Sequence, residues 1–353
     1  MFRYLAKRAA TYLLMIFLTT TAGYFLAVST LQPALLEQER IPRPTPEQVT
    51  NSFRLKGLDP ALTPWERYID WLTAVVTRWD WGRSPNGAFI NAEFGDRVWI
   101  STRLFLASIV LTLVIGVALG VYTAARQYKF QDRVITSYSY LVYIVPAPIA
   151  YFLVQLGAIN VNETIGERIF FVTGISTPGL EGSAWVQFVD MVAHYTVPTL
   201  AITLVGWGTY QIAQRQYLLD NVNADFVRTA RAKGLTRNQA IARHALRVSF
   251  IPVAQSIAFT IPAIFAGGFF AEKIFAWPGV GSWSIDAIAL QDVNAATATL
   301  AYGSVIFAIG AILADLAITT SSFSILASSA TAAGSIAFRL VMATAPALSG
   351  RQG

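Results

Sequence analysis

Cysteine is absent from this chain of 353 residues. Its absence excludes a structural disulfide, a thiolate metal site and a cysteine nucleophile. The chain has two histidines, His194 and His244, and neither has carboxylates nearby at metal-ligand spacing. It also lacks the Gly-x-x-x-x-Gly-Lys-Ser/Thr loop that holds nucleotide phosphates, so we do not expect it to hydrolyse nucleotide itself. No catalytic residues, no metal site and no cofactor bound by this chain are expected.

Charged residues are scarce. They make up 13% of the sequence, whereas soluble proteins carry about 25%. Hydrophobic residues make up 54%, and the mean hydropathy is +0.49. We therefore predict an all-α integral membrane protein. The net charge of +6 could indicate nucleic acid, but many of the basic residues flank apolar runs, as in membrane proteins. No nucleic-acid partner is expected.

Apolar runs of bilayer length predict six transmembrane helices, because a membrane-spanning helix needs about 20 apolar residues. They occupy 9–31, 104–125, 134–156, 196–214, 251–270 and 295–319. The basic residues Arg3, Lys7 and Arg8 place the N-terminus in the cytoplasm. The first run is too long for the apolar region of a cleavable signal peptide.

Helix-breaking residues occur in two of these spans. Pro146 and Pro148 should kink or break the third span, and a broken span is tolerated where it faces protein or a water-filled cavity. Gly267 and Gly268 lie near the end of the fifth span. For all four residues two interpretations stay open, the lining of a transport pathway or simple packing.

The spans divide the chain into four parts. Residues 1–31 hold the N-terminus and the first span. Residues 32–103 form a small external subdomain with balanced charge, in which 65–83 predicts an amphipathic helix at the membrane interface. Residues 104–319 form the core, with a cytoplasmic loop at 215–250. The Ala/Ser-rich tail, 320–353, fits a disordered segment, an interfacial helix or an extra apolar segment equally well.

The loop between the fourth and fifth spans is basic and predicts two short helices. Asn223 or Asp225 can cap the first helix, and Gly234 suits its end because a helix C-terminus often needs a positive φ. Thr236 and Gln239 form a capping-box pattern that begins the second helix. One face of the first helix is apolar and should be buried; it carries Phe226, Val227 and Ala230.

The order of residues in this loop resembles the coupling loop of permeases from ATP-binding-cassette (ABC) importers. The matching run reads Asp225-Phe226-Val227-Arg228-Thr229-Ala230-Arg231-Ala232-Lys233-Gly234-Leu235. More narrowly, it resembles the B-type permease of the oligopeptide/dipeptide/nickel importers. The general signature is Glu-Ala-Ala, three residues, then Gly; here Arg228 replaces the Glu, as is usual in the peptide subgroup.

Two further motifs are similar to those of the same family. One is a Glu-x-x-Phe-x-Trp-Pro-Gly-x-Gly segment, with Glu272, Phe275, Trp277, Pro278, Gly279 and Gly281. The other is Asp-x-Gly-x-Ser, at residues 80–84 before the second span. The tail departs from the family, whose members usually end with a short basic segment soon after the last span.

The resemblance implies the type I importer permease fold and a place in the bacterial plasma (inner) membrane. It implies four kinds of partner: a second related permease, two ABC ATPase domains that bind ATP and Mg, an external substrate-binding protein, and short peptides as cargo. The residues implied to meet an ATPase are Asp225, Phe226, Val227, Arg228, Thr229, Ala230, Arg231, Lys233, Gly234 and Leu235. Membrane lipid surrounds the spans.

Alternative functions stay open from the sequence. Within the family, the cargo could be nickel, a metal chelate or glutathione. A secondary transporter would need intramembrane carboxylates, and the first five spans have none, while Asp315 is the one candidate in the last. A receptor or scaffold with an external domain would not need the coupling-like loop.

Overall fold

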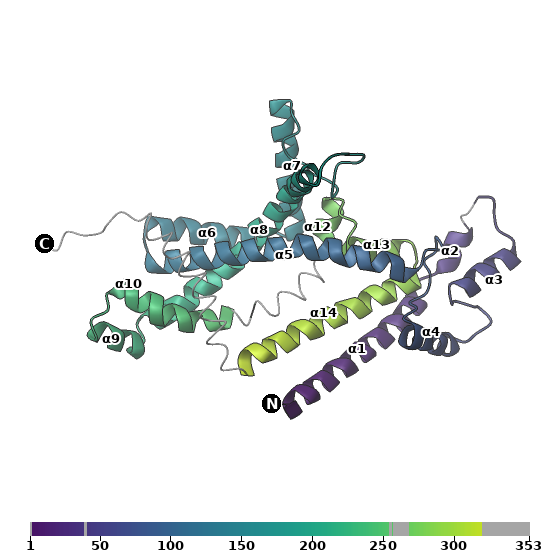
Figure 1. Cartoon of the computed structure of the whole chain (residues 1–353), viewed down its shortest axis with the longest axis horizontal. Helices are drawn as coiled ribbons and strands as arrows, with labels where there is room; N and C mark the ends of the chain where they lie inside the picture. Colours follow the sequence, from purple (N-terminus) through teal and green to yellow (C-terminus); the bar gives the residue numbers. More distant parts are fainter. Residues whose placement is uncertain (1, 39–40, 254–255, 257–267, 320–353) are drawn as a thin grey trace. The chain divides into compact units, whose positions relative to one another are not determined.

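The structure is a computed structural model that describes residues 2–38, 41–253, 256 and 268–319 (Figure 1). Over these residues it is helical, apart from loops and one isolated bridge between Arg83 and Phe89. The predicted all-α class is confirmed. The chain divides into two compact units. The first comprises Met1–Phe105, Thr173–Thr177 and Phe259–Ile312, and the second comprises Leu106–Val172, Pro178–Ala258 and Leu313–Gly353.

Four helices in the described ranges are long and apolar enough to cross a membrane. They are α1 (Phe2–Thr30), α5 (Ile90–Ala125), α8 (Ala184–Val222) and α14 (Val293–Thr319). All four are longer than the sequence predicted, and α5 and α8 exceed their predicted spans the most. Helix α5 starts at Ile90 rather than Leu104, and α8 contains the predicted span 196–214 with extra turns at both ends. Hydropathy marks only the apolar part of a helix, whereas the backbone stays helical into the polar flanks.

The predicted third span is broken, which confirms the expected effect of its prolines. Helix α6 (Phe130–Ile144) and helix α7 (Ala147–Ile165) meet at an angle of 108°. Between them lie Val145 and Pro146 in extended conformations, and Pro148 occupies the first turn of α7. Proline lacks a backbone N–H and disfavours a helical residue before it, so the helix ends at this point and restarts after it.

Two predictions lie wholly or largely outside the described residues. The fifth span, 251–270, is described only at 251–253, 256 and 268–270, and Gly267 is not described. The tail at 320–353 also lies outside.

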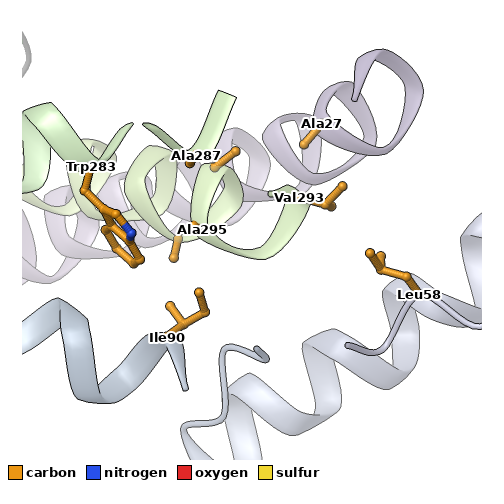
Figure 2. Close-up of a cluster of buried hydrophobic side chains, with 9 residues drawn as sticks. Ala27, Leu58, Ile90, Trp283, Ala287, Val293 and Ala295 are labelled. Atoms are coloured by element: carbon orange, nitrogen blue, oxygen red, sulfur yellow. The ribbon is translucent and has the colours of Figure 1, made fainter. Parts of the chain in front are cut away.

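The first unit joins the N-terminal part of the chain to the start of its last long helix. It holds α1, the short helices α2 (Pro33–Gln38), α3 (Pro46–Leu55) and α4 (Pro64–Arg78), then α12 (Phe269–Ile274), α13 (Val280–Ala289) and most of α14. Figure 2 shows its core cluster, in which Trp283, Ala287, Val293 and Ala295 gather with Ala27, Leu58 and Ile90. Apolar residues from five segments of the sequence therefore hold this unit together.

Close helix contacts hold the second unit together. A side chain at Gly116 or Gly120 of α5 would collide with the backbone of α8, at the carbonyl oxygens of Trp207 and Gln211 respectively. These two glycines form a Gly-x-x-x-Gly pair, which lets helix backbones approach closely in membranes. Gln211 of α8 is fully buried between the helices and donates hydrogen bonds to Thr123 of α5 at 2.9 Å and Thr136 of α6 at 3.3 Å.

Candidate functional site

The first short helix of the basic loop is α9 (Asp225–Ala232), close to its predicted extent. Its N-cap is Ala224, and no side chain caps it, so the expected cap by Asn223 or Asp225 is wrong. Asp225 is instead the first helical residue. Its side chain is 97% exposed and lies 3.6 Å from Arg228, where a carboxylate suits the positive end of the helix dipole.

The exit from α9 follows the predicted pattern. Gly234 has a φ of +96°, a conformation that residues with a Cβ atom rarely adopt. The space around it is open, so the preference for glycine comes from the backbone angle and not from a steric contact. Thr236 then accepts a hydrogen bond from the Gln239 N–H while the Gln239 side chain accepts one from the Thr236 N–H. This capping box starts α10 (Arg237–Ala240), as predicted.

The buried face of α9 packs on its own chain. Val227 and Ala230 are 2% and 6% exposed, and they join a cluster with the adjacent ends of α5 and α8. The other members are Val121, Ala124, Leu218, Ala240, Ile241, Ala245 and Leu246, with Leu219, Val222 and Leu235 partly buried against them. We call this set the knob core. It ties α9 to two membrane-spanning helices.

Phe226 differs from Val227 and Ala230, because its side chain is 40% exposed in this chain. Phe226 and Val227 lie on either side of Ala230, about 40° and 60° away around the helix, so all three share a broad apolar face. Val227 is at the edge that packs on the chain, and Phe226 is at the outer edge. Contact of these residues with an ATPase stays a prediction. The knob core already covers Val227 and Ala230, which leaves Phe226 as the apolar residue of that set open to a partner.

A π-turn completes the knob core. Helix α10 passes directly into η1 (Ile241–Ala245), where the Leu246 N–H donates to the Ile241 carbonyl five residues earlier. Ile241 and Ala245 both stay buried in the knob core, at 4% and 0% exposure. Such π-turns are rare and occur often at functional sites.

The open surface of α9 is basic. Besides Phe226, it carries the exposed residues Arg228, Thr229, Arg231 and Lys233. A short rigid helix with one aromatic and three basic side chains can dock into a groove lined by acidic or polar groups. Movement of that groove would then be transmitted through the knob core to α5 and α8.

An ion pair connects α8 to α6 close to the same end of α8. The Arg215 guanidinium donates two hydrogen bonds to the Asp132 carboxylate, from Nε at 2.7 Å and from Nη2 at 2.8 Å. Asp132 also accepts from the Tyr128 backbone N–H at 2.9 Å and from the Thr136 hydroxyl at 3.2 Å. The Asp132 side chain is only 3% exposed, and the bidentate pair holds α6 against α8.

The Trp-Pro-Gly motif surrounds a buried carboxylate. Glu272 is 1% exposed; its Oε1 accepts from the Ser101 hydroxyl at 2.5 Å and its Oε2 from the Ser282 N–H at 2.7 Å. Ser101 in turn accepts from the Val280 N–H at 2.9 Å. Burial raises the pKa of the Glu272 carboxyl, and these hydrogen bonds oppose that rise. Any side chain at Gly279 would collide with the carboxylate of Glu272.

The remaining motif residues pack closely around this turn. Phe275 and Trp277 are 0% and 1% exposed, Pro278 follows them in the turn, and a side chain at Gly281 would lie 2.7 Å from the Phe269 Cα. The predicted residues are thus brought together into one structural element, which connects α12 to α13 and to α5.

The Asp-x-Gly-x-Ser motif forms a second joint in the first unit. The Ser84 hydroxyl hydrogen-bonds to Asp292, whose other carboxylate oxygen accepts from the Ala295 N–H at 2.9 Å in the first turn of α14. Asn294 donates to the carbonyl oxygens of Lys56 and Arg83 at 2.8 and 2.9 Å. The motif therefore fastens the segment before α5 to the start of α14.

The residues considered for a pathway are divided between the two units, and their role in a pathway stays a prediction. Pro146 and Pro148 lie at the α6–α7 break of the second unit, whereas Gly268 belongs to the first unit. At Gly268, an added side chain would overlap the ring of Phe105, so this glycine serves close packing.

Sequence reasoning missed several polar partners, namely Ser101, Asp132, Gln211, Arg215 and Asp292. The Gly116-x-x-x-Gly120 spacing was a visible signal for the α5–α8 contact. The polar pairs had no comparable local signal, since Asp132 and Arg215 are far apart in the sequence. Within the part of the chain that the structure describes, no group of three His, Asp or Glu side chains could hold a metal ion.

Comparison with known families places most of the chain in one of them. Residues 116–330 match the family described as "Binding-protein-dependent transport system inner membrane component". The match includes α8, α9 and the knob core.

Individual relatives extend the similarity beyond that range. The oligopeptide transport system permease protein OppB of Mycobacterium tuberculosis is 34% identical over 316 residues, which are 90% of this chain and 96% of OppB. The dipeptide transport system permease protein DppB of Escherichia coli is 27% identical over 261 residues, 70% of this chain and 76% of DppB. The oligopeptide transport system permease protein AppB of Bacillus subtilis is 28% identical over 253 residues, 71% of this chain and 77% of AppB.

Proposed function

Because this chain belongs to the family of binding-protein-dependent transport system inner membrane components, we propose that it forms one membrane-spanning half of an ATP-driven importer for short peptides. Its helices are those of the type I importer permease, and it is a multi-pass membrane protein. The cargo class rests on the relatives, which are oligopeptide and dipeptide transport permeases. Nickel, metal chelates and glutathione have no such support.

One structural observation carries the proposed mechanism. Helix α9 is anchored by Val227 and Ala230 to the ends of α5 and α8, while its basic face with Phe226 stays open. An ATPase that closes on ATP and Mg would move α9 as a rigid element. The knob core would carry that movement into the membrane-spanning helices.

This mechanism needs further subunits, because the chain supplies only one permease and no ATPase. A second related permease would complete the transport path, and each permease would receive one ATPase domain. An external substrate-binding protein would deliver the peptide. The basic residues Lys7 and Arg8 near the start of α1, and the basic α9 segment, favour a cytoplasmic N-terminus in the bacterial plasma membrane.

Reconstitution with omitted partners tests this function. The chain is placed in vesicles with the second permease, both ATPases and the binding protein, and uptake of a labelled short peptide is measured with ATP. Uptake should require every partner and stop when either ATPase is omitted. Uptake by this chain alone, driven by an ion gradient, would instead establish a secondary transporter.

A further inference from the structure

Helix α4 has more apolar surface than the described part of the chain covers. Tyr68, Trp71 and Val75 recur at helical spacing and are buried at 2%, 7% and 8% exposure in a cluster with Tyr24 of α1. A second apolar ridge runs beside this buried face and stays open. Its members are Trp65, Ile69 and Val76, with Trp79 just after the helix, and their exposures are 60%, 42%, 75% and 66%.

The rest of α4 is polar. Glu66, Asp70, Thr73 and Thr77 are exposed on the side away from α1. The helix is therefore amphipathic, and α1 covers only part of its apolar arc. Uncovered apolar surface of this extent indicates an interaction partner.

The contacts between α4 and α1 give the depth of α4 in the membrane. The hydroxyls of Tyr68 and Thr21 lie 2.6 Å apart, and the rings of Trp65 and Phe25 stack with centroids 5.9 Å apart. Lys7 and Arg8 mark one membrane interface, so about 20 further residues place the other hydrocarbon boundary near Val28. At 1.5 Å per residue, positions 21–25 lie roughly 5–10 Å inside that boundary.

That depth is where interfacial helices lie, since their apolar face typically sinks about 5–10 Å into the boundary between head groups and acyl chains. The open ridge also continues the apolar surface of the span itself. Phe25 stacks on Trp65 at the start of the ridge, and Leu26 beside it on α1 is 59% exposed. The two tryptophans suit the head-group level, because their rings are amphipathic.

We propose that α4 is an in-plane membrane anchor whose ridge, Trp65, Ile69, Val76 and Trp79, binds lipid acyl chains. It lies in the leaflet at the C-terminal end of α1, which the proposed topology makes the outer leaflet. The anchor would hold the segment between α1 and α5 against the membrane while peptide is delivered. Lipid contact depends on the depth of α4 and not on the cargo, so it can be tested separately from transport.

Spin labels on this cysteine-free chain test the proposal. Single variants Val76→Cys on the ridge and Thr73→Cys on the polar face receive a nitroxide in the assembled importer, held in discs of phosphatidylethanolamine and phosphatidylglycerol. Collisions are measured with oxygen, which concentrates in the bilayer, and with a nickel chelate, which stays in water. The oxygen-to-nickel ratio should be several-fold higher at position 76 than at position 73. Ile69→Cys repeats the measurement on the same ridge about two helical turns away, where a perturbation at position 76 would not affect it.

Two results would contradict the proposal that α4 is a membrane anchor. If the oxygen-to-nickel ratio were equally low at positions 76 and 73, the ridge would lie in water. Protection of position 76 from both reagents would place the ridge against another protein, such as the second permease or the binding protein. Peptide uptake by the labelled importer is recorded alongside, so a failure of the proposed transport function would be seen independently of the lipid result.

Discussion

Asp132 and Arg215 join α6 to α8 through two parallel hydrogen bonds of 2.7 and 2.8 Å. The carboxylate side chain is almost completely buried and the guanidinium is 21% exposed. Asp132 lies in the first turn of α6, and Arg215 lies one turn before Leu218, the α8 residue of the knob core. It therefore holds a third helix, α6, to the helix pair on which α9 is anchored.

Removal of one partner should destabilise this unit more than removal of both. Arg215→Ala leaves a buried carboxylate without its cation, and we expect a loss of about 3 kcal/mol in the free energy of unfolding. The double variant with Asp132→Ala should recover part of that loss. Unfolding of the purified variants in mixed detergent measures both effects. A double variant whose loss equals the sum of the single losses would show that the pair contributes no coupling.

Phe226 and Val227 are neighbours with opposite expected roles. Val227→Ala removes two buried methyl groups from the knob core, so it should lower the free energy of unfolding by about 1.5 kcal/mol. Phe226→Ala removes an exposed ring, so stability should change by less than about 0.5 kcal/mol, while ATPase binding to the permease pair weakens. Unfolding and ATPase co-purification are measured for both. Unchanged ATPase binding in Phe226→Ala would show that this face does not dock.

Because of Glu272, the free energy of unfolding should fall as pH rises. A salt-bridged acid has the opposite effect. Burial raises the pKa of its carboxyl above the ordinary 4.5, so the folded chain retains the proton to higher pH than the unfolded chain. Stability is therefore highest below the ordinary pKa and falls as pH rises through the raised one. Glu272→Gln lacks this titration. The unfolding midpoint of the wild type should fall relative to that of the variant over this window, and parallel pH profiles would contradict the assignment.

The proposed topology puts the first subdomain and the α9 loop on opposite sides of the membrane. Cysteines introduced at Asn51 and Asn238, both exposed, can be labelled in this cysteine-free chain with a membrane-impermeant maleimide. In intact cells we expect labelling at position 51 and none at position 238, with both labelled after the membrane is opened. Labelling of both positions in intact cells would contradict the topology.

Local backbone chemistry could be predicted from the sequence. Gly234, the Thr236–Gln239 capping box and the break at Pro146 depend on residues within a few positions of one another, and each was predicted correctly. The membrane-spanning character of α1, α5, α8 and α14 followed from hydropathy alone.

Predictions that depended on tertiary packing were less successful. The apolar face of α9 was identified, but its partner was not, because a stripe that contains Val227 and Ala230 fits a groove in its own chain as well as one in an ATPase. Phe226 lies at the outer edge of that stripe and is 40% exposed, whereas Val227 and Ala230 are buried. The Asp132–Arg215 pair and the Ser101–Glu272 contact join distant positions, and a single sequence carries no signal for such pairs.

The coupling role of α9 is tested most directly by peptide-stimulated ATP hydrolysis in the complete reconstituted importer. Three forms are compared: the wild type, Gly234→Val and Gly234→Asn. Valine is strained at the positive φ of this residue, by about 1–2 kcal/mol, whereas asparagine tolerates such angles. Membrane insertion should be normal in all three. We predict that Gly234→Val loses both stimulation by peptide and peptide uptake, while Gly234→Asn retains most of each. Normal stimulation and normal uptake in Gly234→Val would contradict transmission through α9.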